Sequence, residues 1–359
     1  MILDRLSVPI VLAPLAGGAS TPELTAAVSN AGGLGFLAAG YLTAPALKER
    51  IDQARALTGG PLGVNVFVPG RPSDPDAVRA YPATLAEDAR GAGVGLGEAR
   101  YEDDDWAAKI ELLAAERVPV VSFTFGCPDR DVIDRLHQAG SEVWITVTTP
   151  DEARHAVGAG CDVLVLQGIE AGGHRAAFRD DPADVCDGLG LLSLLQLVRA
   201  SVGVPLVAAG GIITGAGIAA VLAAGASAAQ LGTAFMRTPE AGTADVDRKA
   251  LASDAPTAVT RAFTGRLARG IRNRFIDRHT AVAPSAYPEV HYLTAPVRRA
   301  ARAAGDPDLV NLWAGQAHQL GRDIPAAQLV RDLAAEAQAA SRQATQRLSA
   351  PGPNTSDDA

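Results

Sequence analysis

A glycine-rich run that ends in a histidine is the first place in this sequence where residue types suggest chemistry. It reads Gln167-Gly-Ile-Glu-Ala-Gly-Gly-His174 and continues directly from an apolar segment. Histidine exchanges protons near neutral pH, so a side chain projected by such a turn suits general acid or base catalysis. We therefore take His174 as the candidate catalytic residue. The other histidines lack this context, and we interpret them as surface or packing residues. They are His137, His155, His279, His291 and His318.

Two further turns combine glycines with the ends of apolar runs. Gly210 and Gly211 end one run, and Gly232 with Thr233 ends the next. Without side chains, the backbone N–H groups of such turns can approach an anion closely. These turns are therefore candidates for binding the phosphate of flavin mononucleotide (FMN) or of a phosphorylated substrate. Tight strand-to-helix turns would give the same pattern.

Two amides, Asn65 and Gln167, end buried apolar runs. Each can donate and accept hydrogen bonds, which suits the mixed edge of a heterocycle such as isoalloxazine. A bond to a neighbouring loop is an equal alternative, because a buried amide needs a partner in either case.

No metal site is expected. The three cysteines are far apart and form no CxxC pair, and the sequence has no His/Asp cluster at ligand spacing. The acids that follow the sixth run are interpreted as part of a solvated loop. They are Glu170, Asp180, Asp181 and Asp184.

The elements that must position these residues follow an alternating pattern. Short β-rich runs recur between helical stretches, which is typical of βα units and a parallel sheet. Eight repeats favour an α/β (βα)8 TIM barrel, whose site lies at the C-terminal ends of the strands. The predicted strands are residues 9–13, 34–38, 62–67, 118–125, 143–147, 163–167, 204–209 and 228–232.

The barrel is predicted to span residues 1–236, with additions. The third and fourth runs are too far apart for one helix, so residues 68–117 are predicted to carry an insertion. Residues 237–348 are rich in alanine and arginine without convincing strands, and are predicted to form a helical cap or subdomain. Residues 349–359 have nothing to bury and are expected to be disordered.

Composition excludes several classes of protein. The chain has 359 residues and a formal charge of −8, which speaks against binding to nucleic acid or to an anionic membrane. Interrupting prolines argue against a signal peptide, and glycines divide the long uncharged stretch before Arg237 into strand and helix pieces. We expect a cytoplasmic protein.

Taken together, these motifs resemble the nitronate monooxygenase family, formerly called 2-nitropropane dioxygenases. The resemblance covers residues 8–319. Its segments are PIVLAPLAGGASTPELTAAVSNAGGLGFL, GVNVFVP, VSFTFGCP, VLVLQGIEAGGHRA, VAAGGI, AAQLGTAF, FTGRLARGIRNRF and LWAGQ.

The resemblance implies a TIM barrel that binds FMN and a base at His174. It also implies a set of flavin contacts, with the last five around the phosphate. These residues are Ala13, Pro14, Leu15, Asn65, Gln167, Gly172, Gly173, Gly210, Gly211, Gln230, Gly232 and Thr233. Two positions depart from the family pattern, since Leu15 stands where many members have Met and Ala176 where Gly is frequent.

The activity that the resemblance implies is oxidative denitrification of alkyl nitronates, such as propionate 3-nitronate, by O2 to carbonyl compounds and nitrite. His174 would remove the α-proton of a neutral nitroalkane or, when charged, hold a nitronate oxygen. The alternative is an FMN-dependent NAD(P)H oxidoreductase of the quinone reductase or enoyl-acyl-carrier-protein reductase type, and a silent phosphate-binding barrel is a further one. The helices after Met236 could close the site or form a homodimer face.

Overall fold

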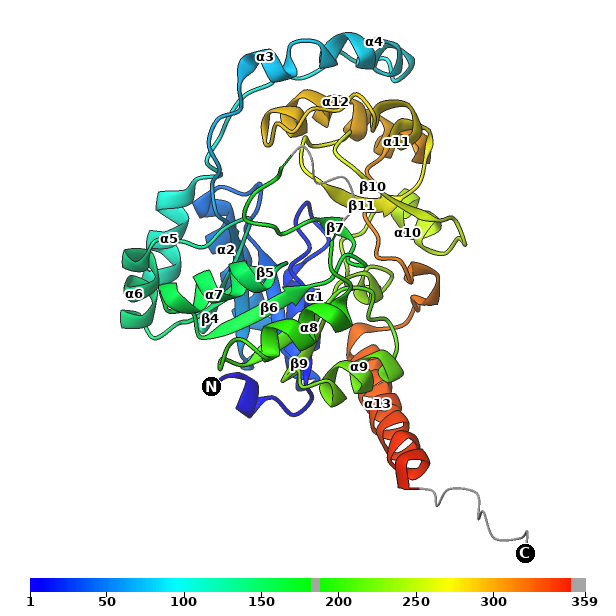
Figure 1. Cartoon of the computed structure of the whole chain (residues 1–359). Helices are drawn as coiled ribbons and strands as arrows, with labels where there is room; N and C mark the ends of the chain where they lie inside the picture. The colour runs from blue at the N-terminus through cyan, green and yellow to red at the C-terminus, as the bar shows by residue number, and fades with distance from the viewer. Residues whose placement is uncertain (182–187, 350–359) are drawn as a thin grey trace, which may run out of the picture.

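The computed structural model describes residues 1–181 and 188–349. Within these residues, eight parallel strands pair in the order β1-β9-β8-β6-β5-β4-β3-β2. A parallel bridge between Val11 and Leu34 joins the two ends of this order, so the predicted TIM barrel is confirmed (Figure 1). Its strands are β1 (Ile10–Leu12), β2 (Gly35–Ala38), β3 (Leu62–Phe67), β4 (Val120–Thr124), β5 (Glu142–Val147), β6 (Val163–Gln167), β8 (Leu206–Ala209) and β9 (Ala228–Leu231).

Helices surround the barrel, and threonine N-caps begin several of them. Thr21, Thr149 and Thr214 each accept a hydrogen bond from a backbone N–H in the first turn, and Pro22 and Pro150 follow two of these caps. Both features stabilise a helix start. The surrounding helices are α1 (Pro22–Asn30), α2 (Ala44–Leu57), α5 (Trp106–Ala115), α6 (Arg130–Gln138), α7 (Pro150–Ala159), α8 (Leu191–Arg199) and α9 (Gly215–Ala223), and a short 3-10 turn, η1 (Leu3–Arg5), precedes β1.

Strand alternation decides which residues enter the barrel interior. Along β6, Val163 and Val165 pack in the interior cluster with Trp144, whereas Leu164 packs in the outer cluster against the helices. Because side chains alternate along a strand, Gln167 continues the inward row at the C-terminal end. Apolar side chains therefore fill the lower interior, and polar ones lie at its upper mouth.

The predicted insertion contains both an excursion and a regular barrel helix. Helices α3 (Pro75–Val78) and α4 (Tyr81–Gly91) leave the barrel and lie beside the C-terminal elements (Figure 1). The Tyr81 hydroxyl donates to the Ala262 carbonyl at 2.7 Å, and Leu85 packs in the same apolar cluster as Phe263. Helix α5 returns to the barrel and packs on α2 and α6.

The expectation that the chain has no strands after Met236 is wrong. Strands β10 (Thr257–Thr260) and β11 (Ala268–Ile271) pair in antiparallel fashion, and β11 also pairs with β7 (Gly173–His174). Four-residue strands give little periodic signal, and the partner of β11 lies about ninety residues earlier in the chain. The helices of this region are α10 (Asp245–Leu251), α11 (Arg274–His279) and α12 (Glu289–Ala304), with short 3-10 turns η2 (Thr233–Phe235), η3 (Pro307–Leu309) and η4 (His318–Leu320).

The last helix, α13 (Ala326–Ser349), packs on helices of the barrel rather than on α10, α11 or α12. Leu329 and Leu333 belong to the outer barrel cluster, and the helix lies along α9 and α1 (Figure 1). Although α13 has 24 residues, neither it nor any other described helix is apolar enough over sufficient length to cross a bilayer. Ser349 ends this helix, and the rest of the predicted tail lies outside the described residues.

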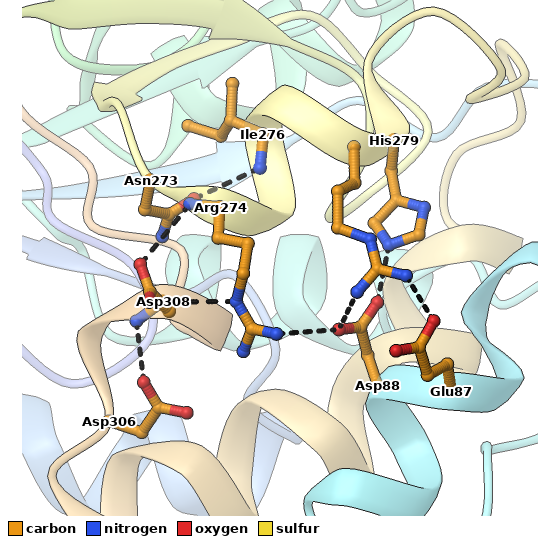
Figure 2. A network of polar contacts seen from close by, with 9 residues as sticks. Glu87, Asp88, Asn273, Arg274, Ile276, His279, Asp306 and Asp308 are labelled. Atoms are coloured by element: carbon orange, nitrogen blue, oxygen red, sulfur yellow. Dashed lines mark hydrogen bonds and ion pairs between the residues drawn. The ribbon is translucent and has the colours of Figure 1, made fainter.

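A buried carboxylate fixes α4 to α11 (Figure 2). The Asp88 side chain is 1% exposed and bonds His279 Nε2 at 2.7 Å, while Arg278 and Arg274 lie at 3.2 and 3.8 Å. Glu87, next to it, also contacts Arg278 but is 73% exposed. A buried charge requires such partners, so this cluster ties the excursion to the C-terminal elements.

We predict that Asp88→Asn destabilises this contact, whereas Glu87→Gln has a much smaller effect. Removing the charge of a buried ion pair leaves its partners uncompensated and costs roughly 3 kcal/mol. An exposed pair contributes little because water screens it. The stability of both variants is measured by thermal unfolding and by hydrogen exchange of the α4 amides. Equal losses of stability in the two variants would contradict the prediction that the buried ion pair matters more than the exposed one.

Candidate active site

A cavity of about 460 Å³ opens at the C-terminal ends of the barrel strands. Its walls include the turns after β1, β6, β8 and β9 together with residues from α10 and α12. Every site residue predicted from the sequence lines it. These are Ala13, Pro14, Leu15, Asn65, Gln167, Gly172, Gly173, His174, Gly210, Gly211, Gln230, Gly232 and Thr233. The structure thus gathers the predicted residues in one place, and their individual roles remain predictions.

His174 is held by the short antiparallel pairing of β7 with β11, in which it lies opposite Ala268. Its Nε2 is 2.9 Å from the Thr264 hydroxyl. The rings of Phe125 and Trp313 each lie with centroids 5.6 Å from the imidazole. The imidazole is therefore oriented by one hydrogen bond and enclosed by aromatic side chains.

This environment keeps the imidazole neutral. Burial, followed by the charges of Arg266 and Arg298, lowers the pKa of His174 to about 3. Desolvation and nearby cations both disfavour the protonated ring. A neutral imidazole has a lone pair that can accept a proton, and the low pKa makes it a weaker base than a free histidine. The alternative in which a charged His174 holds an anionic oxygen is not favoured.

Gln167 positions the histidine loop. Its Nε2 donates to the His174 carbonyl at 2.9 Å, and its Oε1 accepts from the Ala176 N–H at 2.9 Å. Both ends of the amide are thus bonded to the loop that carries the candidate base. Of the two alternatives for Gln167, these bonds support the structural one, although the side chain also lines the cavity.

Asn65 is oriented differently. Its Nδ2 donates to the hydroxyls of Ser122 and Thr124 on the neighbouring strand, at 2.9 and 3.0 Å. No described residue donates to its Oδ1, and the residue lines the cavity. The bonds fix the amide and leave an acceptor for a ligand.

The turns after β8 and β9 both line the cavity, and the first has a backbone that favours glycine. Gly210 and Gly211 have φ of 125° and 67°, in the left-handed region that favours glycine. Thr233 begins η2, and its hydroxyl accepts from the Gly315 N–H at 3.0 Å. The second turn is therefore fastened to the chain segment around Gly315.

The sequence motifs FTGRLARGIRNRF and LWAGQ, whose contacts the sequence leaves unknown, both meet at His174. Thr264 and β11 come from the first motif, and Trp313 from the second. Arg266 lies over the Phe125 ring at 4.1 Å, and its guanidinium also donates to backbone carbonyls of the histidine loop. These two segments contact the candidate base from the side opposite the barrel.

Sequence reasoning missed part of the cavity wall. His291, interpreted as surface or packing, instead lines the cavity and stacks on Tyr41 with centroids 4.2 Å apart. Burial, then the charge of Arg298, lowers the pKa of His291 to about 2. Arg298 lies on the same helix and also lines the cavity. The spacing of His291 and Arg298 in α12 is common to amphipathic helices, so only the fold shows that these residues line the cavity.

The remaining histidines are placed as surface or packing residues. His155 is exposed, and His137 contacts Asp162 with its side chain 35% exposed. His279 and His318 are buried against Asp88 and the carbonyls of Leu251 and Ala255.

The acidic residues after β6 have structural partners. Glu170 accepts from the Leu191 N–H at the start of α8, and Asp180 pairs with Arg261 at 3.1 Å while accepting from Ser285. Asp180 is only 12% exposed, so the interpretation as a solvated loop is wrong there. Asp184 lies outside the described residues. Over residues 1–181 and 188–349, no group of His, Cys, Asp or Glu has a metal-binding arrangement.

Known proteins resemble this chain over nearly its whole length. The family model of nitronate monooxygenase matches residues 2–336. A probable nitronate monooxygenase of Staphylococcus aureus (strain JH9) is 38% identical over 89% of this chain and 91% of that protein. The structure of nitroalkane oxidase from Streptomyces ansochromogenes has a TM-score of 0.93 at 51% identity, covering 96% of this chain and 99% of that one.

A second solved structure is less similar. FabK from Thermotoga maritima has a TM-score of 0.73 at 27% identity, with 97% of this chain and 96% of that one covered. Family model, sequence identity and fold therefore agree along the whole barrel and the C-terminal region. The chain belongs to the nitronate monooxygenase family of flavin-dependent oxidoreductases.

Proposed function

We propose that this protein oxidises alkyl nitronates with O2 to carbonyl compounds and nitrite, with FMN as cofactor and His174 as base. The observation that carries the proposal is a neutral imidazole in the same cavity as two glycine turns suited to a phosphate. The likeness to nitroalkane oxidase from Streptomyces ansochromogenes supports the same chemistry. Propionate 3-nitronate is the expected substrate, and a homodimer in the cytoplasm stays a prediction.

The residues of the cavity fit FMN. A volume of about 460 Å³ lies within the range of small-molecule sites. Gly173 has a φ of 75°, and a Cβ added there would meet no atom within 4 Å, so open space adjoins the loop before the base. Gly210, Gly211, Gly232 and Thr233 would hold the phosphate, and Asn65 would offer its Oδ1 to the ring system. A bound flavin would supply an electron acceptor for the oxidation of the nitronate.

The protein side of the mechanism begins with the tautomer of His174. The Thr264 hydroxyl donates to the Arg266 carbonyl at 3.3 Å, which leaves it to accept from His174 Nε2 at 2.9 Å. The hydrogen is then on Nε2, and Nδ1 is the basic nitrogen. A neutral nitroalkane would lose its α-proton to this nitrogen. A nitronate is already deprotonated and would not need it.

We predict that flavin-loaded protein releases nitrite from propionate 3-nitronate in air without NAD(P)H. Release of nitrite is measured colorimetrically, and the cofactor freed by denaturation is identified by chromatography. Loss of nitrite formation in the absence of O2 is the control. A yellow protein that forms no nitrite but oxidises NADH with quinones or enoyl thioesters would instead support the reductase alternative.

His174→Asn is predicted to keep the flavin and lose turnover of neutral nitroethane by roughly 10²- to 10⁴-fold, the usual contribution of a general base. Turnover of preformed ethyl nitronate should fall far less, because no proton must be removed. His155→Asn is the matched control, since this histidine is exposed on α7. Full nitroethane turnover by His174→Asn would remove this residue from the role of base.

The pH dependence follows from the low pKa of the base. The active form of His174 is deprotonated, so its contribution is lost only as pH falls toward a pKa of about 3. We expect kcat/KM for neutral nitroethane to show no acid limb between about pH 5 and 7, where an unperturbed histidine would titrate. The measurement is a pH profile of initial rates. A limb near pH 6.5 that disappears in His174→Asn would contradict a buried neutral base.

A further inference from the structure

Arg298 is a buried cation on the wall of the cavity. It is 7% exposed and is held by three hydrogen bonds within its own helix, α12. Its Nε donates to the Thr294 hydroxyl at 3.0 Å, and its Nη2 donates to the His291 carbonyl at 2.7 Å and lies 3.4 Å from His291 Nδ1. Its Nη1 has no hydrogen-bond partner among the described residues, and this atom is not fully buried. One edge of the guanidinium is thus fixed, and Nη1 is left at the cavity.

Among the described residues, no carboxylate oxygen lies within 4.0 Å of the Arg298 guanidinium, the distance that defines an ion pair. Arg302, one turn later and also on the cavity wall, differs because it pairs with Asp247 at 3.1 Å. Burial lowers the pKa of Arg298 to about 10, so the side chain stays charged at neutral pH. An uncompensated buried charge is unfavourable, and a bound anion would relieve it.

The surroundings of Arg298 place it in the same part of the cavity as the base. Its charge is one of the causes that lower the pKa of His174 and of His291. Tyr41, which stacks on His291, and Tyr287, whose ring lies 5.6 Å from His174, add aromatic surface around it. Aromatic walls exclude water and strengthen an interaction between charges.

We propose that Arg298 binds an anionic oxygen of the substrate through Nη1. Arg298 then supplies the positive charge that a neutral His174 cannot provide. Two groups share this chemistry, the nitronate itself and the carboxylate of a substrate such as propionate 3-nitronate. The inference rests on the proposed function only in taking a nitronate as the substrate.

The test compares Arg298→Met and Arg298→Lys with the wild type, using ethyl nitronate and propionate 3-nitronate. Loss of one charge-assisted hydrogen bond in a dry site should raise KM by roughly 10- to 100-fold in Arg298→Met. Arg298→Lys keeps the charge but not the guanidinium, so its KM should lie between those of the wild type and Arg298→Met. Arg299→Met is the matched control, because Arg299 is the next residue of α12 and is exposed.

The two substrates separate the two sources of the anion. A rise in KM for both nitronates identifies the nitronate group as the ligand of Arg298. A rise for propionate 3-nitronate alone identifies the carboxylate. KM values equal to those of Arg299→Met for both substrates would overturn the proposal. If Arg298→Met does not fold, the same comparison with Arg298→Lys decides it.

Titration calorimetry with nitrate, at constant ionic strength, tests the anion site without turnover. In FMN-loaded protein, nitrate should bind at least 10-fold more weakly to Arg298→Met than to Arg299→Met, the lower end of the range given above. If the wild type forms no nitrite but nitrate binding depends on Arg298, the proposed function fails and the anion site stands. If nitrite forms but KM and nitrate binding are the same in Arg298→Met as in Arg299→Met, this inference alone fails.

Discussion

The antiparallel pairing of β7 with β11 is the contact on which the site depends. Two residues of a barrel loop, Gly173 and His174, bond to a strand that begins more than ninety residues later. This pairing brings Thr264 to the imidazole and Arg266 onto Phe125. Without it, the glycine-rich loop would have no fixed partner on its outer side, and the imidazole of His174 would lose the hydrogen bond that orients it and the nearby charge of Arg266.

Arginine charge around the site is compensated in several ways. Asp180 neutralises Arg261, and an aromatic face with backbone carbonyls supports Arg266. Arg302 has Asp247, whereas Arg298 has only neutral acceptors, namely a hydroxyl, a carbonyl oxygen and an imidazole nitrogen. Since neutral acceptors compensate a charge less than a carboxylate does, Arg298 keeps much of its positive charge on the cavity wall. A cavity that combines a neutral imidazole with a fixed cation is suited to an anionic ligand.

Two of the three apolar clusters formed by the described residues include elements from the C-terminal part of the chain. The outer barrel core includes α13, although this helix is last in the sequence. The second core joins α4 from the excursion to α11 and α12, with Asp88 fixing the contact between them. The wall that carries Arg298 and His291 is thus anchored to a segment that precedes the fourth barrel strand.

The sequence by itself determined the barrel and the upper ends of its strands. Each apolar run became a strand within two residues of its predicted bounds, because local β propensity and burial on both faces agree. The residues after these runs, such as Asn65 and Gly210, had to reach one cavity, since parallel strands share their C-terminal edge. Only the tertiary structure decided that Gln167 braces the histidine loop, that β11 pairs with β7, and that Arg298 and His291 line the cavity. The bonds of Gln167 are local, but other partners were equally open to a buried amide. The strand pairing and the cavity wall join residues distant in sequence, and the short strands and amphipathic helix that form them carry no pattern that specifies a partner.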